Sequence, residues 1–293
     1  MDEFAIGMGP KLLSFGKGET KYSLRLIPMG GYVQMEGEDE ASEDERAFNQ
    51  KPVWKRFLVV IAGAVMNIIL GLVLVAILLT QQNLIGTTQI AGFHENASSQ
   101  SSGLQEGDVI THINGTSVWS DRDISFLMAR DRDGVIDFTV KRDGQKTELK
   151  NVKFDTREVD GQTVITFDFI IIGENKTFWN VLKTSFLETA SMARLVWLSL
   201  FDLVTGRFGL SDLAGPVGTV SVIAEATTSG GFLNALSLMA FITINIGVFN
   251  LLPIPGLDGG RLFFLIIEGI RRKPINPKRE GMIHAIGLLL LFG

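Results

Sequence analysis

Cysteine is missing altogether from these 293 residues. Disulfide bonds and thiolate metal sites are therefore excluded, and the redox compartment cannot be read from the sequence. An excess of basic residues is missing as well, because the net charge is −5, and this argues against a nucleic-acid partner. The start of the chain lacks the basic stretch and apolar core of a secretory signal peptide, and no internal repeat is present.

Apolar residues are abundant, at 46% of the chain, and they are concentrated in long runs. Residues 57–80 and 232–257 contain no charged side chain, and each run exceeds the 20 or so residues that a membrane-spanning helix needs. A third run begins near Ile283 and is still apolar at Gly293. We therefore predict a membrane protein, with buried core helices of a soluble protein as the alternative.

Basic residues flank these runs and predict their orientation. Lys51, Lys55 and Arg56 precede the first run, and five Lys or Arg residues lie within 271–279, between the second and third runs. Short basic flanks are typically cytoplasmic. Residues 81–229 are then predicted to lie outside.

The polar segments have local patterns of their own. Residues 12–15 and 22–26, separated by the turn Gly16-Lys17-Gly18, predict a β-hairpin with an extra strand at 32–35. Ser42 and Glu45 predict a capping box that opens a short helix toward Phe48.

Residues 87–172 are typical of a small β-rich domain. Strands are predicted at 109–113 and 136–140, with turns at Asn114-Gly115 and Asp143-Gly144. Ser120 and Asp123 predict the cap of a short helix whose apolar face is Ile124, Leu127 and Met128.

Residues 179–204 predict an amphipathic helix. Its polar stripe consists of Asn180, Thr184, Glu188, Ser191 and Arg194. Such a helix is expected to lie along a membrane surface or to pack on a neighbouring domain, and the sequence leaves both placements open.

The most informative stretch is 250–260, at the end of the second apolar run. Two prolines and three glycines lie there and break the predicted helix, and Asp258 lies among them, between Leu257 and Gly259. Broken helix at membrane depth is tolerated only in a protein interior or beside a wet cavity, and an ionisable residue there indicates function. A carboxylate is also a zinc ligand, although an interfacial Asp at a helix end is the simpler alternative.

The spacing Asn-x-x-Pro-x-Pro-x-Leu-Asp-Gly, from Asn250 to Gly259, resembles the second active-site motif of the site-2 proteases, which are intramembrane zinc metalloproteases. Residues 4–10 and 26–33 resemble the membrane-associated β-loop of the bacterial RseP and RasP branch. Residues 103–115 are similar to the single PDZ domain of that branch, and residues 213–218 to its loop before the later membrane helices. The match at 63–67 is partial, because relatives commonly have Gly-Pro there.

The resemblance implies a multi-pass α-helical protein of the bacterial cytoplasmic (inner) membrane. It would have an N-terminal membrane-associated β-hairpin and an inserted extracytoplasmic PDZ domain, which is β-rich and of the α+β kind. The implied segments are a β-loop at 1–36, an acidic linker and short helix at 37–56, a transmembrane helix at 57–80, the PDZ domain at 86–175, an amphipathic interfacial helix and loop at 178–228, a broken transmembrane helix at 232–271 and a truncated transmembrane helix at 281–293.

The implied activity is zinc-dependent cleavage of single-span membrane proteins inside the lipid bilayer. Asp258 would hold Zn²⁺ together with two histidines of a His-Glu-x-x-His motif, whose glutamate would be the general base, and Asn250 would orient the substrate or stabilise an oxyanion. The N-terminal hairpin would grip the substrate by strand pairing. The PDZ domain, unless it is a structural spacer, would bind a peptide in a groove beside Thr88, Gln89, Ile90, Ala91, Gly92 and Phe93.

The sequence departs from the family at the other half of the site. Its histidines are His94, His112 and His284, and none lies in a His-Glu-x-x-His context, so we expect ordinary surface or turn residues rather than zinc ligands. Relatives carry that motif on a helix before the region that matches residues 2–10. We expect either a fragment of an active protease, inactive alone, or a non-catalytic membrane-bound PDZ scaffold (a pseudoprotease). A transporter with an ion site at Asp258 would need paired repeats, and the sequence has none.

Overall fold

The computed structural model describes residues 3–16, 20–37, 42–131, 133–159, 162–206, 231–273, 275 and 277–292. Two compact units divide the chain, one formed by Met1–Met66 with Gly247–Gly293 and the other by Asn67–Ile246. The predicted loop at 213–218 and part of the predicted turn at 16–18 lie outside the described residues. The chain is a mixed α and β structure with two long apolar helices.

The N-terminal sheet consists of two long strands that each fold back, β1 (Glu3–Phe15) and β2 (Lys21–Gln34). Residues 3–6 pair with 21–24 in parallel and with 31–34 in antiparallel register, while residues 11–15 pair with 22–25. Four segments therefore lie side by side in the order 11–15, 21–25, 3–6 and 31–34. The predicted hairpin and its extra strand are confirmed, and the strand 3–6 between them was not predicted.

The acidic linker contains less helix than its sequence predicts. Ser42 accepts a hydrogen bond from the Asp44 N–H and donates one to Glu36, so its hydroxyl does not cap a helix. Among the described residues 42–52, the only helical turn is a 3₁₀ turn, η1 (Phe48–Gln50). The predicted capping box is therefore wrong, because Ser42 closes a local turn instead.

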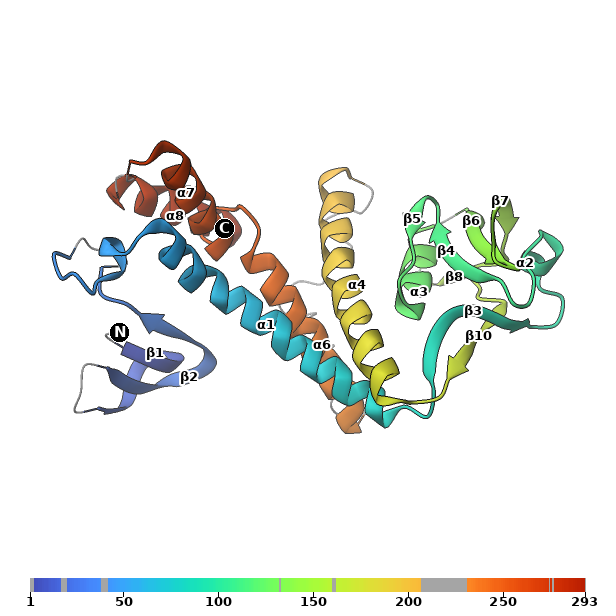
Figure 1. Ribbon diagram of the computed structural model, residues 1–293, viewed down its shortest axis with the longest axis horizontal. Helices are drawn as coiled ribbons and strands as arrows, with labels where there is room; N and C mark the ends of the chain where they lie inside the picture. The colour runs from blue at the N-terminus through green and yellow to red at the C-terminus, as the bar shows by residue number, and fades with distance from the viewer. Residues whose placement is uncertain are drawn as a thin grey trace. The chain divides into compact units, whose positions relative to one another are not determined.

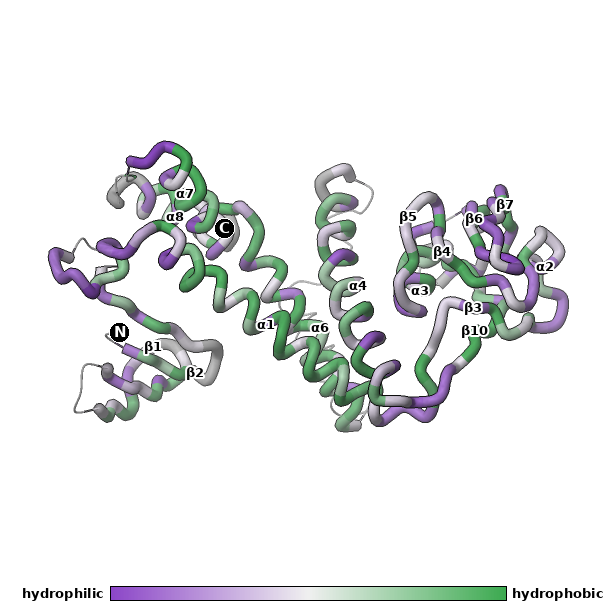
Figure 2. The backbone as a smooth tube through the Cα atoms, viewed as in Figure 1, coloured by the Kyte–Doolittle hydropathy of each residue, from purple (hydrophilic) through white to green (hydrophobic). Residues whose placement is uncertain are grey.

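Two described helices are long and apolar enough to cross a membrane, α1 (Val53–Gln81) and α6 (Gly231–Asn250). Figure 2 shows hydrophobic residues along most of both helices. Only 22% and 28% of their most apolar stretches are buried, whereas the core helix of a soluble protein is mostly buried. Gly71 permits close packing of the two helices, since a Cβ there would lie 2.3 Å from the Ile244 side chain.

A β-rich module follows α1, and its main sheet has the strand order β10-β3-β4-β6-β7, with β5 paired to β4 (Figure 1). Its elements are β3 (Ile85–Phe93), α2 (Ser98–Ser101), β4 (Val109–Ile113), β5 (Thr116–Ser117), α3 (Asp121–Ala129), β6 (Val135–Arg142), β7 (Gln145–Lys153), the pair β8 (Thr156–Val159) and β9 (Gln162–Ile165), and β10 (Phe169–Glu174). The predicted strands and both turns are confirmed. Asn114, Gly115, Asp143 and Gly144 all have the positive φ of tight hairpin turns.

The core of this module is formed by alternating residues of the sheet and one face of α3. Phe138, Ile90 and Leu104 are fully buried, and Ile124, Leu127 and Met128 of α3 pack against them as predicted. Asp123 accepts hydrogen bonds from the N–H groups of Trp119 and Ser120, and it thereby fixes the start of α3.

Helix α4 (Phe178–Val204) is amphipathic, and its polar side is buried. Three arginines join the module to α4 through the pairs Arg122–Glu188 (2.9 Å), Arg194–Asp123 (3.0 Å) and Arg130–Asp202 (2.6 Å). The opposite side exposes Trp179, Leu182, Phe186, Trp197 and Phe201. Of the two predicted placements, packing on the neighbouring domain therefore accounts for the polar stripe.

Candidate functional site

The predicted break in the second apolar run is confirmed: α6 ends at Asn250, and α7 (Asp258–Arg271) begins eight residues later. Pro253 and Pro255 have no backbone N–H, so helical hydrogen bonding cannot continue. Short-range bonds replace it, from the N–H of Ile254 to the Leu252 carbonyl (2.7 Å) and from that of Leu257 to the Ile254 carbonyl (3.1 Å). The result is a tight loop at 251–257.

Two glycines after Asp258 let the first turn of α7 pack directly against this loop. A Cβ on Gly259 would lie 2.1 Å from the Leu252 carbonyl oxygen, and one on Gly260 would lie 2.6 Å from that of Ile254. No side chain fits at either distance. The Asp-Gly-Gly order therefore places Asp258 at a fixed position on the loop.

Asp258 lines a cavity of about 690 Å³ together with the N-terminal sheet and α1. The sheet contributes residues of segments 3–6 and 31–35, and α1 contributes Val59, Val60 and Gly63. An ideal Cβ on Gly63 would lie 3.8 Å from a carboxylate oxygen of Asp258. The charged residues in the cavity wall are Asp258 and Arg261, one helical turn apart, in otherwise mostly apolar surroundings.

The segment 31–34 forms one edge of the N-terminal sheet beside this cavity. It pairs with 3–6 on one side, and within the described residues no other strand pairs with it. Only glycine fits at position 31, because a Cβ there would lie 2.5 Å from the Ala5 carbonyl oxygen of the neighbouring strand. An unpaired strand edge is a template for an added extended chain.

His284, on helix α8 (Pro277–Phe292), is a part of this region that sequence reasoning missed. Its Nδ1 accepts a hydrogen bond from the Gly256 N–H at 2.9 Å, and its ring contacts Phe264 edge-on. The Gly256 N–H therefore occupies the lone pair that Nδ1 would otherwise offer to a metal. His284 therefore holds the loop in place rather than being an ordinary surface residue.

The signal for His284 in the sequence is weak, since 28 residues separate the hydrogen-bonded pair. Gly287, one turn later, also contacts the loop, because a Cβ there would lie 2.0 Å from the Pro255 carbonyl oxygen. Sequence reasoning also missed Arg261, although its position three residues after Asp258 on one helix is a stronger signal.

The other predicted site residues lie in different places. Asn250 is the last residue of α6, half-buried, at the start of the same loop. His94 follows β3 and His112 lies within β4, both in the β-rich module. Within the described residues, no group of three or more His, Asp or Glu side chains is arranged to hold a metal ion. The described donors alone, with one carboxylate at the cavity, thus do not fit a complete zinc site.

The predicted peptide-binding residues Thr88, Gln89, Ile90, Ala91, Gly92 and Phe93 form most of β3. This strand pairs with β10 on one side, and on the other side Gln89 and Ile90 pair with residues 107–109. Gly86, next to this segment, lies against the start of α3, since its Cβ would be 2.2 Å from an Asp121 oxygen. An added peptide strand would therefore have to avoid the backbone at Gln89 and Ile90.

Comparison with known proteins gives consistent relatives over the whole chain. The model of Peptidase family M50 matches residues 1–293. A protein of Clostridium acetobutylicum named "Putative zinc metalloprotease" is 38% identical over 292 residues, which cover 99% of this chain and 85% of the relative. Regulator of sigma-W protease RasP of Bacillus subtilis is 30% identical, and the match covers 99% of this chain and 87% of the relative. Zinc metalloprotease RasP of Bacillus licheniformis is 31% identical, and the match covers 99% of this chain and 88% of the relative.

Proposed function

Because the chain belongs to peptidase family M50, the site-2 proteases, we propose that it is part of an enzyme that cleaves membrane-spanning proteins inside the bilayer with the help of zinc. The observation that carries the proposal is the cavity where Asp258, at the first turn of α7, lies beside the sheet edge 31–34. A carboxylate and a strand template in one apolar cavity suit hydrolysis of an extended peptide.

The strand edge meets a physical need of this reaction. A substrate helix must unwind before its peptide bond can be attacked, and its freed backbone groups cannot remain unpaired in lipid. The edge 31–34 offers N–H and C=O partners to one extended segment of the substrate. The exposed apolar side chains of the same sheet, including Ile6, Leu13 and Phe15, suit a place within the membrane.

Asp258 is proposed as one zinc ligand, and zinc when bound supplies a Lewis acid and an activated water. A catalytic zinc site takes about three protein ligands. We propose that the other two are histidines on a segment outside these 293 residues, with a glutamate beside them as general base. Asn250, at the start of the loop, is proposed to orient the substrate.

Helices α1 and α6 support a proposed membrane arrangement. Both are proposed to span the cytoplasmic membrane of a bacterium, with the basic residues before α1 and after α7 in the cytoplasm. The β-rich module at 86–175 then lies on the outer side as a PDZ domain that admits only suitable substrates. Residues 88–93 are proposed to border its peptide groove, away from the paired backbone at Gln89 and Ile90.

The exposed apolar side of α4 suits the membrane surface. Trp179 and Trp197 are amphipathic aromatic residues of the kind enriched where lipid meets water. The arginine pairs with α3 hold this side outward from the module. The module and α4 are thus proposed to dock on the bilayer as one piece.

The test uses the complete reading frame, including its upstream segment, and a single-span reporter substrate in bacterial membranes. Asp258→Asn removes a charged ligand with little change of shape, so cleavage should stop while membrane insertion is unchanged. Glu106→Gln, an exposed carboxylate of the module, is the matched control and should cleave normally. Retained turnover in Asp258→Asn would remove Asp258 from the site.

A non-catalytic scaffold that binds membrane segments without cutting them is the second candidate. The DNA upstream of Met1 separates the two. An apolar run in frame that carries His-Glu-x-x-His supports the protease, whereas an in-frame stop before any such motif supports the scaffold.

A further inference from the structure

A second cavity, distinct from the one at Asp258, lies between the first turns of α1 and the last turns of α7. Its volume is about 860 Å³, and it is lined chiefly by apolar side chains, among them Trp54, Phe57, Leu58 and Ile266. All of its lining residues belong to the same compact unit. The proposed function assigns it no role.

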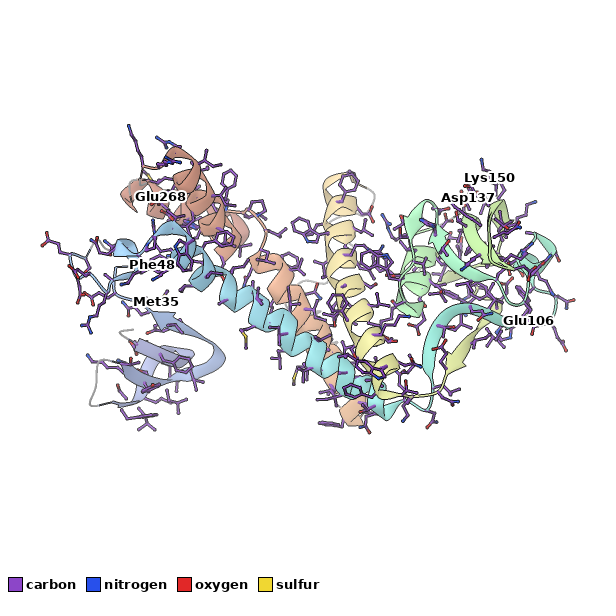
Figure 3. The ribbon with its side chains drawn as sticks, viewed as in Figure 1. Met35, Phe48, Glu106, Asp137, Lys150 and Glu268 are labelled. Carbon is purple, nitrogen blue, oxygen red and sulfur yellow. The ribbon has the colours of Figure 1, made fainter. Side chains whose placement is uncertain are left out.

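The mouth of this cavity is cationic. Arg272 and Lys273 line it and are exposed, and within the described residues neither has a carboxylate at salt-bridge distance. Among the described lining residues, the acidic one is Glu268, and both terminal nitrogens of Arg56 already bind its carboxylate (Figure 3). Lys55 adds a further cation, with its ammonium 5.4 Å from the Trp54 ring centroid.

Backbone geometry holds these cations at the cavity. Arg272 ends α7 in the left-handed conformation, with φ 53°, so the chain turns away from the helix axis at that residue. The carbonyl end of a helix favours positive charge nearby. Arg272 and Lys273 therefore follow the C-terminal end of α7 in the lining of the cavity.

We propose that this cavity binds an anionic phospholipid of the cytoplasmic leaflet, an inference that rests on the proposed membrane arrangement. The acyl chains would contact the apolar wall, and the phosphate would contact Arg272 and Lys273. Basic pockets between membrane helices on the cytoplasmic side typically bind anionic head groups. Charge complementarity decides the occupant: a further apolar helix would bury the two cations without a partner, and the cation of a zwitterionic head group would be repelled.

Trp54 provides the readout, since it lines the cavity and is 61% exposed. The complete protein is placed in bilayers of phosphatidylcholine with a minority of phosphatidylglycerol. Two samples are compared, one with brominated acyl chains on phosphatidylglycerol and one with them on phosphatidylcholine. The brominated lipid has the same mole fraction in both, and bromine quenches the fluorescence of a tryptophan that it contacts. The signal from Trp54 is the difference between the wild type and Trp54→Phe, which removes the contribution of the other tryptophans.

Brominated phosphatidylglycerol should quench Trp54 more strongly than brominated phosphatidylcholine. Arg272→Gln with Lys273→Gln should abolish the preference, with about a fivefold loss of relative affinity for each cation. Lys146→Gln with Lys150→Gln, two exposed lysines of the module, is the matched control and should change nothing. Equal quenching by both lipids, or a preference that survives the Arg272 and Lys273 changes, would overturn the proposal.

The same preparation tests the lipid-binding proposal and the proposed protease function independently. Asp258→Asn should lose cleavage and keep the lipid preference, and a lost preference with intact cleavage would sink the lipid site alone. If neither brominated lipid quenches Trp54, the cavity does not face lipid and the proposal is wrong, whatever the cleavage assay shows.

Discussion

The contact between His284 and Gly256 gives the sharpest prediction about the loop at 251–257, which directly precedes Asp258. His284→Ala removes the acceptor of the Gly256 N–H, which lies 2.9 Å from Nδ1. The bond is part-buried, and an unpaired donor costs about 1–3 kcal/mol when it is fully buried, which sets the upper limit here. If that energy holds the loop in its active geometry, kcat/KM should fall by about 5- to 150-fold.

His284→Asn tests whether the loss comes from the acceptor itself, because the Asn side-chain oxygen can accept the same bond. Much of the lost activity should return in this variant. His94→Ala, which removes an exposed histidine of the module, should cleave at the wild-type rate. Rates are measured with the complete protein in detergent at several substrate concentrations, so that kcat and KM are separated.

Two results would refute this reasoning about His284. Wild-type activity in His284→Ala would show that the loop needs no support from α8. Equal loss of bound zinc in the Ala and Asn variants would show that His284 is a metal ligand rather than a positioning residue.

Two further predictions concern packing and pH. Gly259→Ala should lower the melting temperature strongly and abolish cleavage, because its Cβ would lie 2.1 Å from the Leu252 carbonyl oxygen, whereas Gly281→Ala, with open space around it, should be neutral or slightly stabilising. Burial raises the pKa of Glu188, although Arg122 opposes the shift. A raised pKa means that the folded state binds the proton more tightly, so the free energy of unfolding of the module with α4 should fall as pH rises from the usual Glu value through the raised one. Denaturant titrations at several pH values should show this slope, and Glu188→Gln should flatten it; an unchanged slope in that variant would exclude Glu188 as its origin.

The elements that the sequence predicted well are those fixed by local physics. The hairpin turns at Asn114-Gly115 and Asp143-Gly144 require positive φ, and Asn, Asp and Gly tolerate it. The break after Asn250 follows from two prolines within three residues. Such features depend on a few neighbours in the chain, and they need no knowledge of the tertiary fold.

The wrong or incomplete predictions have two causes: a residue with two alternative hydrogen-bonding roles, and contacts between residues far apart in the sequence. Ser42 had two possible roles, and a turn with Glu36 and Asp44 prevailed over a helix cap. The polar stripe of α4 was correct, but its pattern could not reveal that Glu188 would meet Arg122, 66 residues away.

The candidate site shows the same division. Asp258 could be predicted as a site residue because an acidic residue beside a broken apolar helix is unusual whatever surrounds it. Its surroundings, from the edge 31–34 to His284, come from segments far apart in the chain.

The zinc content of the purified complete protein is the most direct test of the account, measured for the wild type, Asp258→Ala and the control Glu106→Gln. We predict stoichiometric zinc in the wild type and the control, and its loss in Asp258→Ala. Zinc that stays stoichiometric without the Asp258 carboxylate would contradict the assignment of this residue to the metal site.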